Sequence, residues 1–318
     1  MAQVLAGKLV VLMGGGGFAG RHLAQELLSR GARLRVVGRH VERAAALRPL
    51  GGLGQVQLLR GDLTKPATLP GLLANADAVV NLVGTFAGDL DAVMGRGAGM
   101  LAAAAKAAGA SAFVHVSAIG ADADGETEYA RAKAAGEAAV LAAFPGATIM
   151  RPSILFGPDD NFVMMFAGLV SSLPVLPVFG PSAKLQPLLV DDLALAICAA
   201  LADPAAHGGQ TFELAGPEVV TMGELNRRIA KAAGRSPVLA ELPDAVSGAI
   251  AALTGWLPLA PITRQQWQLL KAGNVASGQL PGCEALGISP RAMGLYLDRW
   301  LARFRKNGRF GAKPMIDG

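Results

Sequence analysis

The chain has 318 residues, of which 52% are hydrophobic and 17% are charged, and this composition excludes disorder over its whole length. Its 29 basic and 24 acidic side chains give a net charge of +5, which permits an anionic cofactor, partner or membrane surface without requiring one. Because aromatic residues make up only 5%, we expect no nucleic acid among its partners.

The cysteines and the N-terminal residues favour a cytoplasmic protein. Cys198 and Cys283 have neither metal-ligand spacing nor a paired motif, so we expect buried thiols in a reducing compartment. Residues 1–11 lack the apolar core of a secretory signal, and no uncharged apolar run of about 18 residues predicts a membrane span. The nearest such segment, 245–262, is interrupted by glycines and prolines, and we interpret it as buried or interfacial.

The first 150 residues alternate between two kinds of hydrophobic pattern. Residues 8–13 form a short continuous apolar run that is typical of a buried parallel strand, and residues 18–30 place leucines on one helical face before Gly31. Alternating strands and helices predict an α/β fold with a Rossmann-type doubly wound parallel sheet. The further expected strands are 33–37, 55–59, 76–83, 111–116 and 147–150. The further expected helices are 41–47, 88–108 and 128–144, and residues 65–73 are expected as a short helix or a turn.

This rhythm ends after Pro152, where prolines and glycines predict loops and short helices up to residue 187. Asp191 and Asp192 are expected to cap a helix over 193–201, and 211–214 is the last expected core strand. Thr221 and Glu224 form a capping-box pattern before a helix over 222–233.

We therefore expect two domains. Residues 1–152 with 192–216 would form the dinucleotide-binding domain. Residues 153–191 with 217–318 would form a smaller, mostly helical lobe on the side of a substrate or partner. The tail of this lobe, residues 299–313, is basic.

A glycine-rich turn follows the first expected strand and opens the first expected helix. Gly14, Gly17 and Gly20 would allow, in that order, a tight turn, the approach of the backbone to a pyrophosphate, and close packing of helix and strand. The start of the helix would supply free N–H groups and a positive dipole end for the phosphates. The sequence therefore predicts a dinucleotide site at this turn.

The second expected strand ends at Arg39, where an NAD-selective site usually carries a carboxylate. A guanidinium here can pair with a 2′-phosphate, with help from Arg21 or Arg43, so we expect NADP(H) rather than NAD(H) as the cofactor. Alternatively, Arg39 only stacks on the adenine. Asp62, after the third expected strand, either accepts a hydrogen bond from the adenine amino group or is a plain turn residue.

Tyr129 and Lys133 form a YxxxK motif on an expected helix, and a spacing of four residues places both side chains on one face. A nearby ammonium group favours the phenolate, and the lysine can also hold the nicotinamide ribose, so the pair suits acid–base chemistry beside a hydride transfer. The full set of expected cofactor-binding residues is Gly14, Gly17, Phe18, Gly20, Arg21, Arg39, Asp62, Leu63, Val83, Gly84, Tyr129, Lys133, Pro152 and Ile154.

Ser117 is the third residue of the expected catalytic set, although the position that should carry the hydroxyl aligns with Ala118. A shift of one residue at a strand end turns a side chain to the other face of the sheet. His115 is interpreted as a core histidine with satisfied hydrogen bonds. No metal site is expected, because the adjacent carboxylates Asp159 and Asp160 would point apart.

Taken together, these motifs resemble the extended short-chain dehydrogenases/reductases. The matching residues are the glycine turn, Tyr129 with Lys133, Arg151-Pro152, Phe156-Gly157-Pro158 and Val190-Asp191-Asp192. The stretches GGGGFAGRHL, HVSAIGADAD, YARAKAAGE and RPSILFGPDDNF are similar to the bacterial form of the NAD(P)H-binding accessory subunit family of respiratory complex I. That resemblance implies a peripheral subunit on the cytoplasmic side of the inner membrane that holds NADPH tightly without evident turnover.

Three functions remain open from the sequence. The first is an accessory subunit whose NADP(H) is mainly structural, contacting peripheral-arm subunits of complex I or anionic lipid headgroups. The second is an active NADP-dependent reductase, epimerase or dehydratase that uses Tyr129 and Lys133, with a pocket lined by residues 153–189. The third is a binding module that senses redox state without chemistry.

Overall fold

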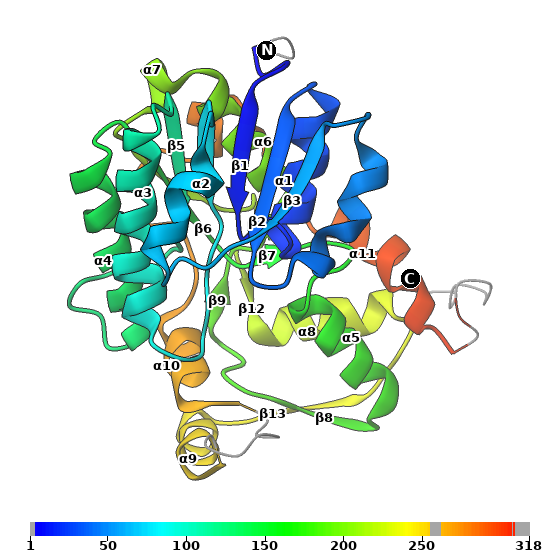
Figure 1. Ribbon diagram of the computed structural model, residues 1–318. Coiled ribbons are helices and arrows are strands. Elements are labelled where there is room, and N and C mark those ends of the chain that lie inside the picture. Colours follow the sequence, from blue (N-terminus) through cyan, green and yellow to red (C-terminus); the bar gives the residue numbers. More distant parts are fainter. Residues whose placement is uncertain (1–3, 255–261, 307, 309–318) are drawn as a thin grey trace. The chain divides into compact units, whose positions relative to one another are not determined.

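The structure is a computed structural model that describes residues 4–254, 262–306 and 308 (Figure 1). The chain divides into two compact units. The first consists of Met1–Pro152, Val190–Leu214 and Ala276–Pro290, and the second of Ser153–Leu189, Ala215–Val275 and Arg291–Gly318. The expected division differs mainly at residues 276–290, which were placed in the second lobe and belong to the first unit.

The first unit is built on a sheet of seven parallel strands in the order β11-β6-β5-β4-β1-β2-β3. The strands are β1 (Leu9–Met13), β2 (Arg33–Gly38), β3 (Val56–Arg60), β4 (Ala78–Asn81), β5 (Ala112–Val116), β6 (Thr148–Pro152) and β11 (Thr211–Leu214). Strand β1 pairs with both β2 and β4, so the order of strands reverses at β1. This order confirms the Rossmann-type fold.

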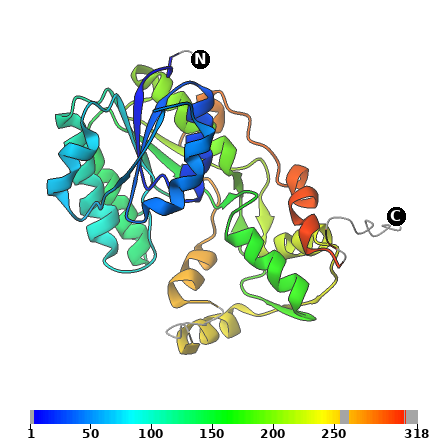
Figure 2. The same cartoon turned by 45° about the vertical axis from the view of Figure 1, so that its right-hand side comes forward.

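Helices cover both faces of the sheet (Figure 2). Helices α2 (Leu69–Leu73), α3 (Gly97–Ala107) and α4 (Glu128–Ala143) pack on one face, and α1 (Phe18–Ser29) and α6 (Val190–Ala202) pack against each other on the opposite face. The shorter helical segments of this unit are η1 (Val41–Leu50), η2 (Pro66–Thr68), η3 (Asp91–Arg96), α7 (Pro204–His207) and η4 (Cys283–Leu286).

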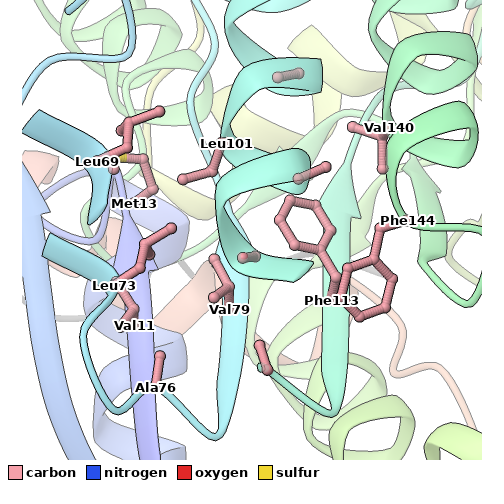
Figure 3. Packing of buried hydrophobic residues seen from close by; sticks show 14 of the residues in the cluster. Val11, Met13, Leu69, Leu73, Ala76, Val79, Leu101, Phe113, Val140 and Phe144 are labelled. Atoms are coloured by element: carbon pink, nitrogen blue, oxygen red, sulfur yellow. The ribbon is translucent and has the colours of Figure 1, made fainter. Parts of the chain in front are cut away.

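The main core of the first unit lies between the sheet and helices α2 to α4 (Figure 3). Val11 and Val79 from the central strands meet Leu101 of α3, and Phe113 of β5 packs against Phe144 with ring centroids 5.7 Å apart. Burying each such side chain contributes about 1.5–3 kcal/mol. This packing holds the strand ends, and therefore the loops that follow them, in fixed positions.

Two expected helices differ in the structure. The segment expected as a helix over 41–47 is the 3-10 helix η1, which contains Pro49. The segment expected as one helix over 88–108 begins instead with the π-helical turn η3 before α3. Gly136 of α4 lets the Met94 carbonyl of η3 approach so closely that a Cβ atom would clash with it. The irregular turn is thus a consequence of tertiary packing rather than of local sequence.

The aspartates expected to cap a helix over 193–201 lie inside it. Helix α6 begins at Val190, so Asp191 and Asp192 occupy its first turn, where their charges complement the helix dipole. The Asp191 carboxylate is 2.6 Å from Nδ1 of His22 on α1, which ties the two packed helices together. The cap assignment was therefore wrong by the length of one turn, whereas the dipole interpretation stands.

The second unit contains short ladders and helices around its own apolar core. Its strands are β7 (Leu155–Phe156), β8 (Val175–Val178), β9 (Lys184–Leu185), β10 (Leu188–Leu189), β12 (Val220–Thr221) and β13 (Val238–Glu241). Its helices are α5 (Phe162–Ser172), α8 (Met222–Ala232), α9 (Asp244–Thr254), α10 (Arg264–Ala272), α11 (Gly294–Trp300) and η5 (Leu301–Phe304).

Helix caps of the second unit partly match the expected ones. The hydroxyl of Thr221 accepts from the amide of Glu224, as expected, but the Glu224 carboxylate pairs with Arg228 instead of completing a capping box. The complete capping box lies at Thr263 and Gln266, at the start of α10. Residues 245–254 of the apolar segment lie in α9, and residues 255–261 lie outside the described part. Of the basic tail, residues 307 and 309–313 also lie outside it.

The return segment, residues 276–290, closes the open edge of the sheet at β11. The Glu213 carboxylate accepts from both the amide and the hydroxyl of Ser277, and the Glu213 amide donates to the Pro281 carbonyl. An edge strand without such a partner would leave its backbone groups open to pairing with another chain. This segment therefore belongs physically to the sheet.

None of the described helices combines the length and the hydropathy that a membrane crossing needs. Among the described histidines, cysteines and acids, no group of three or more could hold a metal ion. Cys198 and Cys283 are buried, and burial raises the pKa of the Cys198 thiol to about 12, which makes it unreactive.

Candidate functional site

The candidate site lies in the first unit, where the order of strands reverses between β1 and β4. All seven strands are parallel, so their carboxyl ends share one edge of the sheet. The glycine turn follows β1, and the loop over residues 82–90 follows β4. In open α/β sheets, ligands bind at this reversal point.

The glycine turn has the geometry that its spacing predicts. Gly14 has a φ angle of +82°, which glycine adopts readily, and a side chain there would press on Val83 at 3.1 Å. A Cβ atom on Gly20 would lie only 2.5 Å from the Cα of Gly15, so α1 packs directly on the turn. Gly15 was not singled out from the sequence, yet a Cβ there would lie 2.7 Å from Leu12, so it is equally required.

The start of α1 is suited to an anion. Its N-cap residue, Gly17, provides no side-chain hydrogen bond, and the first turn contains no acidic residue. No cap side chain therefore accepts from the first N–H groups of the helix, and no carboxylate in the first turn offsets the positive end of its dipole. A pyrophosphate would fit this donor set, and the absence of a Cβ at Gly17 leaves it room to approach. Phe18 begins the helix, and Nη1 of Arg21 donates to the Gly16 carbonyl at 3.2 Å.

At the ends of β2 and β3, the structure brings Arg39 close to Asp62. The Asp62 carboxylate accepts from the amide and the hydroxyl of Thr64 at 3.0 and 2.9 Å, which is a turn arrangement. The Thr64 amide, and more weakly the Arg39 charge, lower the pKa of Asp62. Arg39 is exposed, whereas the Leu63 side chain is buried in the main core.

Tyr129 and Lys133 share one face of α4, as their spacing predicts. The hydroxyl of Thr127 caps this helix by accepting from the Ala130 amide at 3.1 Å. The Lys133 ammonium nitrogen lies 5.8 Å from the centre of the Tyr129 ring and donates to the Val116 carbonyl at 3.1 Å. It also lies 3.8 Å from where a Cβ on Gly84 would be. The pair thus meets the ends of β4 and β5.

The electrostatics of this pair contradict the expected activation of the phenol. Burial raises the pKa of Tyr129 to about 12, and burial lowers the pKa of Lys133 to about 8 with a smaller opposing effect from Glu137. The Lys133 nitrogen lies over the ring and donates to a backbone carbonyl, so desolvation outweighs any stabilisation of a phenolate. In this structure the phenol is a weak acid near neutral pH.

Glu137 is a further member of the buried polar group around Lys133. Its carboxylate forms two hydrogen bonds, of 2.9 and 2.7 Å, with the guanidinium of Arg151 on β6. The carboxylate is buried and paired, so it raises the Lys133 pKa only in part. The sequence offered a signal for this residue, since Glu137 lies four positions after Lys133 on the same helix face.

His115 and Ser117 lie at the end of β5, and both are buried. The Asn81 side chain accepts from the Val83 amide through its oxygen, so its nitrogen faces Nδ1 of His115 at 3.1 Å. Nε2 of His115 then carries the proton. Neither this nitrogen nor the Ser117 hydroxyl has a hydrogen-bond partner among the described residues. The interpretation of His115 as fully satisfied was therefore wrong, because only one of its nitrogens is bonded. Burial lowers its pKa to about 3.

An aromatic residue that the sequence analysis did not single out covers Tyr129. The ring of Phe86, in the loop after β4, stacks on the Tyr129 ring with centroids 4.5 Å apart and planes inclined by 16°. The only sequence signal was an aromatic residue within a glycine-bounded loop, and that signal does not say which helix the loop meets.

The last two expected cofactor-binding residues lie on either side of the boundary between the units. Pro152 is buried at the end of β6 in the first unit. Ile154 belongs to the second unit, where its carbonyl accepts from the Leu188 amide at 2.9 Å.

A hollow of about 390 Å³ lies elsewhere on the first unit, at the start of β1 rather than at its end. Its lining contains none of the expected site residues, so we do not assign the dinucleotide to it. It is lined by Leu9, Arg33, Leu34, Arg35, Gly54, Gln55, Val56 and Gln57.

Comparison with known proteins agrees with this geometry. Residues 14–163 match a family model described as NAD(P)H-binding. The chain is 31% identical to NADH dehydrogenase (ubiquinone) 1 alpha subcomplex subunit 9, mitochondrial, of Arabidopsis thaliana, over 97% of this chain and 81% of that protein. The chain belongs to the subunit 9 family. This family assignment confirms the resemblance to NAD(P)H-binding proteins of the short-chain dehydrogenase/reductase type.

Two further comparisons concern an enzyme and a fold. The chain is 33% identical to the ceramide reductase of Caulobacter vibrioides over 74% of each chain. The crystal structure of DesIV, a dTDP-glucose 4,6-dehydratase from Streptomyces venezuelae with NAD bound, superposes with a TM-score of 0.72 at 19% identity, covering 95% of this chain and 98% of that one. The latter likeness shows the fold alone. The match to the NAD(P)H-binding family model supports a nicotinamide dinucleotide as the cofactor class of this member of the subunit 9 family.

Proposed function

We propose that the chain is an accessory subunit of respiratory complex I that holds NADP(H) mainly as a structural ligand. The observation that carries this proposal is the likeness to subunit 9 of NADH dehydrogenase along 97% of the chain. The high pKa of Tyr129 disfavours the oxidation of an alcohol at this site, because a phenol that stays protonated at physiological pH is a poor base. A dinucleotide bound only by the folded state would stabilise the protein by mass action.

The residues of the first unit would divide the work of holding this ligand. The glycine turn and the start of α1 would bind the pyrophosphate, with Phe18 and Gly17 at the point of closest approach. Lys133 would hold the nicotinamide ribose, since its ammonium lies beside Gly84 and donates to the carbonyl of Val116, the residue before Ser117. The bound group would supply hydride chemistry only if an acceptor could reach it.

Arg39 supports NADP(H) rather than NAD(H), because an exposed guanidinium ends β2 where a carboxylate would select the ribose 2′-OH. We expect Arg39→Ala to weaken NADPH binding roughly ten- to a hundredfold while changing NADH binding little. Isothermal titration with both nucleotides checks this. Arg33→Ala is the matched control, since Arg33 lies at the opposite end of the same strand. Equal losses for NADPH and NADH would contradict the assignment.

The location and partners follow from the proposed role. We place the protein peripherally, on the cytoplasmic side of the inner membrane, against peripheral-arm subunits of complex I. Basic residues near the C-terminus, such as Arg299 and Arg303, would add contact with anionic lipid headgroups. A respiratory complex purified through another subunit should contain this chain in stoichiometric amount. Its absence from an active complex would refute the proposal.

A second candidate function is an NADP-dependent reductase. The likeness to a ceramide reductase and the presence of both Tyr129 and Lys133 favour it. Under this function, the native protein should oxidise bound NADPH when a carbonyl compound is added, and Tyr129→Phe should abolish that oxidation. Stoichiometric NADPH that stays reduced in the presence of carbonyl compounds, with Tyr129→Phe indistinguishable from the native protein, would reject it.

A further inference from the structure

The loop over residues 82–90 spans the Tyr129–Lys133 pair. Its start, at Gly84, lies beside the Lys133 ammonium, and its middle, at Phe86, stacks on the Tyr129 ring at 4.5 Å. One loop therefore contacts both members of the pair at once.

The conformation of this loop is fixed by a local hydrogen-bonded turn. The Thr85 hydroxyl donates to the Ala87 carbonyl at 2.9 Å and accepts from the Ala87 amide at 3.1 Å, which brackets Phe86. Gly88 follows with a φ angle of +80°, a conformation that glycine adopts readily. These features fix the local conformation of the loop around residue 86, while the main core holds β4 and α4, which carry the loop and Tyr129, in place.

Phe86 is 60% exposed, and its one aromatic contact is the ring of Tyr129. Because single exposed apolar residues are common on protein surfaces, the contact with Tyr129, and not the exposure of Phe86, points to a role at the site. Within the described part of the chain, the Tyr129 hydroxyl has no hydrogen-bond partner. The stack with Phe86 and the packing against the cluster of Leu90, Met94 and Ala132 therefore orient this side chain together.

We propose that Phe86 is a cover on Tyr129 that restricts access of carbonyl acceptors to the dinucleotide and slows the release of the dinucleotide. This inference rests on the proposed function, because it explains how a site with both Tyr129 and Lys133 can hold NADPH without turnover. An acceptor that hydrogen-bonds to the phenol must displace a ring already in van der Waals contact with it. Phe86 is thus a positioning residue and not a catalytic one.

The stack itself can be observed in the absence of nucleotide. The chain contains two tyrosines, so Tyr296→Phe leaves Tyr129 as the only tyrosine. In that background, the ring signals of isotopically labelled Tyr129 should show the ring-current shift of a stacked neighbour in the NMR spectrum. Phe86→Leu should remove the shift, and Phe86→Tyr, made in the same background, should retain it on Tyr129. Unchanged signals in Phe86→Leu would overturn the stack.

The covering role is tested on the native protein loaded with NADPH. Phe86→Ala should release NADPH on the order of tenfold faster and increase acrylamide quenching of its fluorescence several-fold, because one stacked pair is lost. Phe86→Leu should lie between Phe86→Ala and the native protein, and Phe86→Tyr should behave as the native protein. Leu53→Ala, a fully exposed apolar residue of another loop in the same unit, is the matched control.

The outcomes separate this inference from the proposed function. If the native protein retains no NADPH, the proposed function fails and the cover fails with it. If the native protein retains NADPH but Phe86→Ala changes neither release nor quenching, only the cover is overturned. A folded Phe86→Leu variant with faster release and an unchanged unfolding temperature supports it, whereas a lowered unfolding temperature without faster release shows a merely structural role.

Discussion

The two halves of the candidate dinucleotide site are built in opposite ways. At the glycine turn, the structure is made of backbone, and Gly14, Gly15 and Gly20 are required because a Cβ atom at each would be strained or would clash. Around Lys133, the structure is made of buried side chains, and two polar atoms, on His115 and Ser117, have no partner. The first half is fixed by sterics at little electrostatic cost, whereas the second keeps desolvated polar groups that destabilise the fold. Such groups persist where a ligand completes them.

The largest effect is expected where sterics alone decide. Gly20→Ala would place a Cβ atom 2.5 Å from the Cα and the carbonyl oxygen of Gly15, so α1 must move away from β1. We expect a loss of about 3 kcal/mol in the free energy of unfolding, measured by urea denaturation. Gly16→Ala is the control, because its nearest neighbour would be 3.5 Å away. If Gly20→Ala and Gly16→Ala lower the free energy of unfolding equally, sterics do not fix the glycine turn.

The second prediction concerns the buried lysine. The folded-state pKa of Lys133, about 8, lies below its unfolded value of 10.5, so the unfolded chain binds more protons between these values. The stability of the nucleotide-free protein should therefore rise with pH across this window, by about 3 kcal/mol in full. Lys133→Met should remove that rise and increase stability at pH 7, while NADPH affinity falls roughly ten- to a hundredfold.

The measurement for Lys133→Met is urea denaturation between pH 8 and pH 9.5, a range chosen to stay below the titration of tyrosines. Lys106→Met is the matched control, because Lys106 is exposed on α3 and should show neither effect. A Lys133→Met protein that keeps the native pH dependence would show that the ammonium is solvated, and the contrast between the two halves would weaken.

The smallest of the three effects is expected at His115. Its folded-state pKa, about 3, is below its unfolded value of 6.5, so the unfolded chain takes up the proton first as the pH falls. Stability from this group is fully present above pH 6.5 and is lost toward pH 3, by roughly 2 kcal/mol at pH 5. His115→Gln should lose less stability between pH 7 and pH 5 than the native protein. His40→Gln, at an exposed position, should lose as much stability as the native protein. If it instead loses as little as His115→Gln, another group is responsible.

The contrast also explains what could be predicted from the sequence. Buried parallel strands appear as continuous apolar runs, such as that around Val11, and the glycine spacing is local, so the sheet and the first half of the site were predicted. Phe86 and Asn81 could not be assigned, because their roles depend on which loop meets α4 and which strand lies beside β5. The π-turn at η3 and the return of residues 276–290 to the sheet likewise arise from contacts between distant parts of the chain.

The pairing of Glu213 with Ser277 and Pro281 has a consequence for how the protein is made. Ribosomal synthesis delivers β11 some sixty residues before the segment that closes its edge, and the intervening residues belong to the second unit. During that interval the nascent sheet exposes a strand edge that can recruit a neighbouring nascent chain. The sheet of this protein is therefore completed only late in translation, and premature termination before residue 276 would yield an aggregation-prone fragment rather than a functional smaller domain.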